Sequence, residues 1–195
     1  MIEKDNKQGK LIVFSAPSGS GKTTIVRHLL GKNDLNLEFS ISATSRDKRA
    51  TEVDGKDYYF LSAQEFKNKI KNEEFLEWEE VYRDNFFGTL KTEVERIWAL
   101  WKHVIFDIDV SGGLRIKRKF PDETLAIFVK PPSIDELKIR LKKRKTESDE
   151  KISMRVAKAS AELATAPLFD EIVVNDNLEN AFKDAETLVT NFINS

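Results

Sequence analysis

The stretch Phe14–Ile25, with the sequence FSAPSGSGKTTI, decides the fold of this chain. Its residues Gly21–Thr23 match the end of the phosphate-binding pattern G-x-x-x-x-G-K-[ST], whereas Ala16 occupies the position of the first glycine. An apolar run, Leu11–Ser15, precedes the loop, and Lys22–Leu30 follows it with apolar residues at helical spacing. A strand, a glycine-rich turn and a helix in this order direct backbone N–H groups toward a phosphate. This context favours a phosphate-binding loop over a chance match in a surface turn.

Alanine at position 16 is the departure from that pattern. It lies where the expected strand leaves the sheet, and its methyl group is harmful only if Ala16 needs a positive φ or touches the ligand. Glycines remain inside the turn, where close approach to phosphate matters more. We therefore predict that the loop binds a triphosphate, with Lys22 at the β and γ phosphates and Thr23 on Mg²⁺. The loop residues expected to bind ATP are Ala16, Pro17, Ser18, Gly19, Ser20, Gly21, Lys22, Thr23 and Thr24.

Short apolar strands alternate with helical segments along most of the chain. Further strands are expected at His103–Ile108, Leu125–Val129 and Ile172–Val174. Helix start signals also occur, because Ser62 and Ser133 begin capping-box patterns and Asn177 suits the N-cap of a last helix. This alternation predicts an α/β fold with a parallel central sheet covered by helices on both faces.

The segment Phe39–Thr89 interrupts the alternation. Its expected strands are short and polar, with turn residues at Asp54–Gly55 and Asp84–Asn85. Phe75–Tyr82 is expected to lie beside Phe86–Thr89. We therefore predict a small, partly antiparallel insertion rather than a part of the core sheet.

Two basic segments could bind anions. Arg46 and Arg49 lie three residues apart with Tyr58 downstream, and two guanidinium groups with a phenol can enclose one phosphate. Two arginines in a loop are otherwise usually solvated surface. The run Lys138–Lys145, KIRLKKRK, is strongly basic, and a solvated helix face is the alternative for its lysines.

Composition excludes several classes of protein. The 195 residues suffice for one domain, and the net charge of −1 provides no global field for nucleic acid or an anionic membrane. The absence of cysteine excludes disulfides and thiolate metal sites. The polar N-terminal segment has no apolar signal region, and no apolar run has the roughly 18 residues of a membrane helix. We expect a cytoplasmic protein with no nucleic-acid or membrane partner, either a monomer or a homodimer.

The chain resembles the guanylate kinases in many motifs that occur in the family's order, from about Lys10 to the last expected helix. These motifs are APSGSGKTT, SISATSRDKR, EVDGKDYYF, FLEWEEV, FFGT, FDIDVSGG, PPSIDELKIRLKKR and IVVND. The resemblance implies a P-loop NTPase three-layer fold with a GMP-binding insertion and a mobile helical lid. It implies the reaction ATP + GMP → ADP + GDP with Mg²⁺, use of dGMP as well, and a place in purine nucleotide metabolism and GTP supply.

The resemblance also implies how the single domain, 1–195, is divided. The core would comprise 1–38, 93–136 and 164–195. The GMP-binding insertion would comprise 39–92, and the lid 137–163.

Roles follow from the resemblance residue by residue. The GMP-binding residues would be Ser42, Arg46, Arg49, Tyr58, Glu77, Phe87, Gly88, Thr89, Asp107 and Asp109. The catalytic residues would be Lys22, Arg140, Arg144 and Arg155, with the three arginines closing over the transferred phosphoryl group. Asn175 would lie beside the adenine, and Thr23 with Asp107, through water, would hold Mg²⁺. A carboxylate such as Glu77 suits guanine, because it accepts from both N1–H and the exocyclic amine, whereas adenine presents an acceptor at N1.

The sequence departs from the family's pattern at a few positions besides Ala16. Phenylalanines stand at Phe86 and Phe87, where the family usually has tyrosines, and the second tyrosine gives a phenol to the GMP phosphate. Loss of that donor predicts weaker GMP binding, because such a hydrogen bond contributes about 0.5–1.5 kcal/mol. Ser111 stands where glutamine is common, and Tyr82–Asn85 is one residue longer than the usual connection.

Two other functions remain open from the sequence. Guanylate-kinase-like domains of some scaffold proteins bind phosphorylated peptides without catalysis, but they typically have degraded phosphate-binding loops, whereas Lys22 and Thr23 are intact here. A kinase acting on another phosphorylated acceptor, such as a ribose bisphosphate, would have no use for Glu77 together with Ser42.

Overall fold

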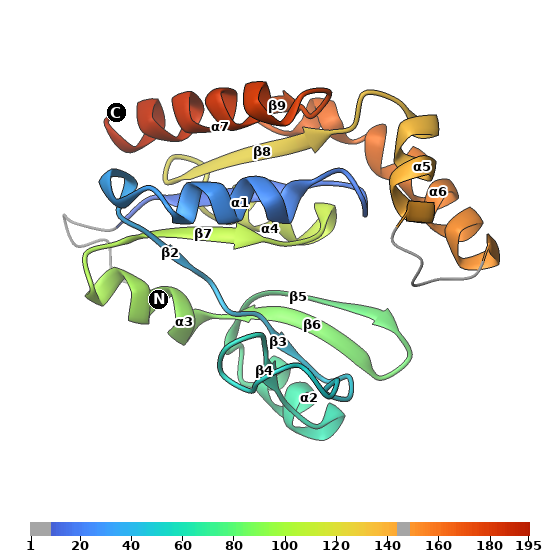
Figure 1. The fold of residues 1–195 in the computed structure, drawn as a ribbon. Helices are drawn as coiled ribbons and strands as arrows, with labels where there is room; N and C mark the ends of the chain where they lie inside the picture. Colours follow the sequence, from blue (N-terminus) through green and yellow to red (C-terminus); the bar gives the residue numbers. More distant parts are fainter. Residues whose placement is uncertain (1–8, 144–148) are drawn as a thin grey trace.

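A computed structural model describes residues 9–143 and 149–195 of the chain (Figure 1). Its core is a five-stranded parallel sheet in the order β2-β7-β1-β8-β9. The strands are β1 Leu11–Ser15, β2 Leu37–Phe39, β7 His103–Asp107, β8 Thr124–Lys130 and β9 Glu171–Val174. Every residue of β1 is buried, as expected for a continuous apolar run at the centre of a parallel sheet.

Helices cover both faces of this sheet, which gives the predicted three layers. Ile12 and Phe14 of β1 pack in one cluster with α1 Lys22–Leu30 and α7 Leu178–Ile193. Leu11 and Val13 point to the other face, where their cluster includes residues of α3 Lys91–Ala99 and α4 Val110–Lys119. The alternation of side chains along one buried strand therefore builds two separate cores.

Strand β2 was not predicted. The segment Leu37–Phe39 has only three residues and none of them is fully buried, so its sequence carries no strand signal. It forms because it pairs in parallel with β7, where Leu37 lies opposite His103. Tertiary pairing rather than local propensity decides such short edge strands.

The predicted insertion forms a second sheet with the order β4-β3-β6-β5. Its strands are β3 Ala43–Thr44, β4 Tyr59–Phe60, β5 Phe75–Tyr82 and β6 Asn85–Leu90, and β3 and β5 each pair antiparallel with β6. Helix α2, Ala63–Lys71, covers it through Phe66, whose ring stacks on Phe75 at 4.2 Å and on Phe86 at 5.2 Å between centroids. Figure 1 shows this sheet set apart from the core sheet.

Two helices, α5 Ile134–Lys143 and α6 Asp149–Leu163, pack on each other at the end of the molecule opposite α3 (Figure 1). The short 3-10 helices η1 Asn33–Leu35 and η2 Ala166–Leu168 complete the fold. The predicted capping signals are in place. Ser62 forms a reciprocal capping box, Ser133 Oγ accepts from the N–H of Glu136 at 3.0 Å, and Asn177 caps α7.

Candidate active site

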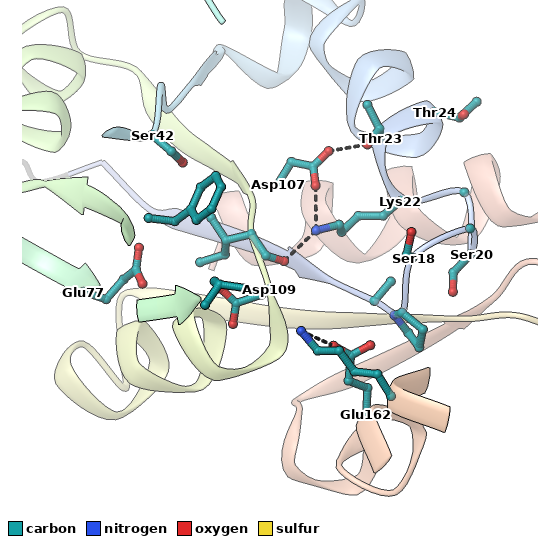
Figure 2. A pocket seen from close by; sticks show the side chains of 18 of the residues that line it. Ser18, Ser20, Lys22, Thr23, Thr24, Ser42, Glu77, Asp107, Asp109 and Glu162 are labelled. Carbon is teal, nitrogen blue, oxygen red and sulfur yellow. Dashed lines mark hydrogen bonds and ion pairs between the residues drawn. The ribbon is translucent and has the colours of Figure 1, made fainter. Parts of the chain in front are cut away.

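A cavity of about 420 Å³ lies at the carboxyl ends of β1 and β7, between the phosphate-binding loop, the second sheet and α6 (Figure 2). The carboxyl edge of a parallel sheet is where α/β proteins bind their ligands. The cavity is lined by Ala16, Pro17, Ser18, Gly19, Ser20, Gly21, Lys22, Thr23, Thr24, Ser42, Tyr58, Glu77, Val81, Phe87, Gly88, Asp107, Ile108, Asp109, Lys158 and Glu162. The structure thus brings all the predicted loop residues together with seven of the ten predicted GMP-binding residues.

The turn of the loop depends on glycines. Gly19 and Gly21 have φ values of +96° and +93°, in the left-handed region that favours glycine. Gly21 also precedes α1, and a Cβ there would lie 2.2 Å from Nδ2 of Asn175. That amide donates to the carbonyl of Ser20 at 2.7 Å, so Asn175 holds the loop from behind. Asn175 was predicted beside the adenine, but it is buried and does not line the described cavity.

Ala16 fits its position without strain. It is only 8% exposed and does not have a positive φ. Alanine therefore satisfies the backbone conformation at the end of β1.

Ala16→Gly is expected to change kcat by no more than about threefold, because the existing backbone needs no glycine there. Stability should fall by roughly 0.5–1 kcal/mol, since glycine has more conformational freedom in the unfolded chain. Steady-state kinetics and thermal unfolding of both proteins test this. A gain of orders of magnitude in rate would show that the alanine impairs the loop.

Lys22, Thr23 and Asp107 form one network at the start of α1 (Figure 2). Lys22 Nζ lies 2.6 Å from Asp107 Oδ1 and donates to the carbonyl of Ile108 at 2.6 Å. Thr23 Oγ1 donates to Asp107 Oδ2 at 2.6 Å. The hydroxyl and carboxylate oxygens are thus adjacent, which suits Mg²⁺, a hard cation that typically takes one or two protein oxygens and keeps water and phosphate as its other ligands. No cluster of three or more His, Cys, Asp or Glu side chains suited to a metal occurs among the described residues.

Glu77, on β5, is a buried carboxylate that faces the cavity (Figure 2). It is 6% exposed and accepts a hydrogen bond from Thr89 Oγ1 at 2.8 Å. The pKa of Glu77 is raised to about 7, chiefly because the carboxylate is buried; the Thr89 hydrogen bond opposes the shift, and nearby Asp109 adds to it. The lack of a side chain at Gly112 makes room for this carboxylate, because a Cβ there would lie 2.8 Å from Glu77 Oε2.

Asp109 both lines the cavity and caps a helix. It lines the cavity beside Glu77, as expected. Its Oδ1 also accepts from the N–H of Gly112 at 2.9 Å, which makes it the N-cap of α4. The carboxylate is therefore fixed in direction by the helix that it caps.

The predicted phosphate pocket is only partly assembled around the cavity. Tyr58 lines it and packs edge-to-face with Phe87 at 6.0 Å, but Arg46 and Arg49 do not line it. Arg46 instead donates from Nη1 and Nη2 to Glu52 at 2.7 and 2.6 Å, and the Arg49 side chain is 75% exposed. This fork lowers the pKa of Glu52 to about 2.

Glu52 is a residue that the sequence analysis missed. Its Oε2 also accepts from the backbone N–H of Arg49 at 2.8 Å, so it joins both predicted arginines. An acidic residue six positions after Arg46 has no periodic relation to it in the sequence. Only the folded turn brings the two together.

The predicted lid arginines are found in different places. Arg155, on α6, donates from Nη1 to Ser18 Oγ of the loop at 2.6 Å. Arg140, on α5, bonds to Glu136 at 3.0 Å and to the carbonyl of Asn175 at 3.1 Å, and it does not line the described cavity. Arg144 lies outside the described residues.

The sequence analysis also missed two charged residues of α6, Lys158 and Glu162. Both line the cavity, at positions three and seven residues after Arg155. That spacing places all three on one helix face, so the signal was present in the sequence. It was obscured because α6 carries many charged side chains.

No helix in the described part of the chain is long and apolar enough to cross a membrane.

Comparison with known proteins identifies the family. The family model described as guanylate kinase matches residues 8–192. A guanylate kinase of Bacteroides thetaiotaomicron is 52% identical over 95% of this chain and 91% of the relative, and one of Porphyromonas gingivalis is 53% identical over 94% and 98%. The crystal structure of a guanylate kinase from Anaplasma phagocytophilum has the same fold, with a TM-score of 0.75 at 24% identity over 97% of this chain and 89% of that one. Because the family model matches residues 8–192 and relatives about half identical cover nearly the whole chain, the chain belongs to the guanylate kinase family.

Proposed function

We propose that this protein transfers the γ-phosphoryl group of MgATP to GMP, giving ADP and GDP, and that dGMP is also an acceptor. The observation that carries the proposal is that Glu77 and Lys22 face one cavity. A buried carboxylate placed opposite a phosphate-binding loop suits a guanine base on the acceptor and a triphosphate on the donor. Because such nucleotides are made inside cells, we also place the reaction in the cytoplasm.

The donor would bind at the loop. The N–H groups of Ser18–Thr23 and the start of α1 provide positive potential for the β and γ phosphates. Lys22 would exchange its ion pair with Asp107 for a phosphate oxygen. Thr23 and Asp107 would hold Mg²⁺, which supplies charge neutralisation on the phosphate oxygens.

The acceptor would bind against the second sheet. Ionised Glu77 would accept from guanine N1–H and the exocyclic amine, with Ser42 and Thr89 nearby. Tyr58, Arg46 and Arg49 would bind the GMP phosphate. Arg46 is already aligned by Glu52 and lies over the Tyr58 ring at 5.0 Å, so a movement of this segment toward the loop would bring the group to the phosphate.

The transfer itself needs positioning rather than a general base. An oxygen of the GMP phosphate is already anionic and attacks the γ phosphorus, forming one P–O bond. The bond to the oxygen that bridges the β and γ phosphorus atoms breaks, and that oxygen leaves with ADP. The contribution of Lys22, Arg140, Arg144 and Arg155 would be to balance charge on the transferred group.

We further propose that the chain divides into a core, 1–38, 93–136 and 164–195, a GMP-binding insertion, 39–92, and a lid, 137–163. The separate second sheet and the packed pair α5 and α6 support this division. Closure of both parts over the core would exclude water and so limit ATP hydrolysis.

A coupled assay of ADP release with MgATP and each of GMP, AMP, CMP and UMP tests the function. Turnover with GMP alone is the expected result. A folded protein that turns over none of them but binds a phosphorylated peptide would contradict the proposal. Ultraviolet difference titration with GMP and with ribose phosphates would separate a guanine site from a sugar-phosphate site.

Phe87→Tyr is expected to lower the Michaelis constant for GMP by about two- to tenfold, because a phenol adds one hydrogen bond of about 0.5–1.5 kcal/mol to the phosphate. The ring of Phe87 already lines the cavity and contacts Tyr58, so the hydroxyl can be added without new packing. Initial-rate kinetics at saturating ATP measures the effect. Phe86→Tyr is the matched control, because Phe86 is 4% exposed in the core of the second sheet. An unchanged constant in Phe87→Tyr would remove the phosphate role of this position.

A further inference from the structure

Helix α6 presents a charged face to the phosphate-binding loop. Arg155, Lys158 and Glu162 lie on this face at helical spacing, while Ile152 and Ala159 pack against α5. Arg155 reaches Ser18 of the loop at 2.6 Å, which fixes the distance between helix and loop. Lys158 and Glu162 line the same cavity as Pro17 and Ser18, and Figure 2 shows Glu162 beneath the loop.

The charges on this face are coupled. Lys158 Nζ lies 3.6 Å from Glu162 Oε1, and their side chains are 63% and 17% exposed. Burial raises the pKa of Glu162, and Asp109 across the cavity raises it further, while Lys158 and Lys22 oppose the shift. A half-buried carboxylate thus lies where the proposed function brings the negative charge of a triphosphate.

That carboxylate needs a compensating cation when phosphate is near. Lys22 already forms an ion pair with Asp107 at 2.6 Å. Lys158 has a flexible, mostly exposed stem, and its ammonium group carries several donors, so it can bridge Glu162 and a phosphate oxygen together.

We propose that Lys158 is a further phosphate-contacting residue, which binds the donor polyphosphate from the α6 side, and that Glu162 positions its ammonium group. The inference rests on the proposed function for the identity of the donor. It assigns opposite effects to Glu162: the carboxylate orients Lys158, and it repels phosphate wherever Lys158 is missing.

The test measures binding of the β,γ-imido analogue of ATP with Mg²⁺ by calorimetry at pH 8, where Glu162 is expected to be ionised. The variants are Lys158→Ala, Lys158→Gln, Lys158→Arg, Glu162→Gln and the double variant Lys158→Ala with Glu162→Gln. Lys138→Ala is the matched control, because Lys138 is an exposed lysine on α5 that does not line the described cavity. Thermal unfolding of each protein accompanies the titrations.

Both Lys158→Ala and Lys158→Gln remove the charge and are expected to raise the Kd for the analogue about tenfold. This is the lower end of the effect of losing a charge-assisted hydrogen bond, because the lysine is partly exposed. Lys158→Arg should stay within about threefold of wild type, since it keeps the charge. Glu162→Gln alone should change the Kd little, because its two effects offset each other. In the Lys158→Ala background, Glu162→Gln should lower the Kd by about threefold, because it then removes only the repulsion between the Glu162 carboxylate and phosphate.

Several results would overturn the inference. Lys158→Gln binding the analogue as tightly as Lys138→Ala would show that the charge has no contact with phosphate. Equal effects of Glu162→Gln in both backgrounds would remove its positioning role. If Lys158→Ala proves unstable, the Kd measured with Lys158→Gln tests the inference, because glutamine keeps much of the aliphatic side chain and removes only the charge. The binding measurement requires no GMP turnover, so failure of the wild type in the kinase assay would be a separate result.

Discussion

Lys22→Ala is expected to lower kcat for GMP phosphorylation by about 10³-fold, because one preorganised charge on the transferred group contributes about that much. The lysine is held at the start of α1 by Asp107 and by the carbonyl of Ile108. Its removal leaves the backbone of the loop to bind the triphosphate, so the affinity for ATP should fall far less than the rate. Rapid-quench kinetics with saturating MgATP and GMP measures the chemical step.

Lys32→Ala is the matched control for this loss. Lys32 follows the same helix and pairs with Glu186 at 3.0 Å, away from the cavity. The control should retain wild-type kinetics, because surface ion pairs contribute about 0–1 kcal/mol to stability and none to the chemistry. A Lys22→Ala protein that phosphorylates GMP at more than about a tenth of the wild-type rate would contradict the role given to this lysine.

Glu77→Gln is expected to lower kcat/KM for GMP by about 10³-fold. An amide turns one acceptor into a donor, which then faces a donor of guanine and leaves buried polar groups unpaired. The site at Glu77 is almost completely buried, so water cannot repair the mismatch. The ratio of kcat/KM for GMP to kcat/KM for AMP should therefore become smaller. Glu80→Gln is the control, because Glu80 lies on the same strand, is exposed and does not line the described cavity.

The pH dependence of kcat/KM for GMP tests the role of the Glu77 carboxylate in the wild-type protein, without a substitution. Only the ionised carboxylate can accept both guanine donors, and the pKa of Glu77 is raised to about 7. In the wild type, kcat/KM for GMP should therefore fall as the pH drops below about 7. The acceptor phosphate also titrates, at about pH 6, and Glu77→Gln retains that titration while losing the step due to the carboxylate. Identical profiles for the two proteins would assign the fall to the substrate.

Much of the core could be predicted from the sequence, because local signals there agree with the tertiary fold. The run Leu11–Ser15 is apolar throughout and becomes the central strand, and Ser62 and Asn177 cap helices as expected. Strand β2 could not be predicted, since it depends on pairing with β7.

The residues of the candidate site also fall into those that the sequence indicates and those that only the fold brings together. Lys22 and Thr23 lie in one continuous motif, and their neighbours in the sequence are their neighbours in the cavity. The spacing of Lys158 from Arg155 indicates that the two share a helix face, whereas Glu52 meets Arg46 and Arg49 only through the folded turn, so no spacing rule indicates it. The bond from Asn175 to the loop links positions far apart in the chain, and only the order of strands β1, β8 and β9 brings them together.

The pairing of Lys22 with Asp107 gives the loop its own internal counterion. A polyphosphate that reaches this lysine displaces a carboxylate that belongs to the protein rather than small ions from solution. Fewer dissolved ions are then released for each nucleotide bound, and the affinity for ATP should depend less on ionic strength than the number of nearby cations suggests. The enzyme would therefore hold its donor about equally well in dilute and in salt-rich surroundings.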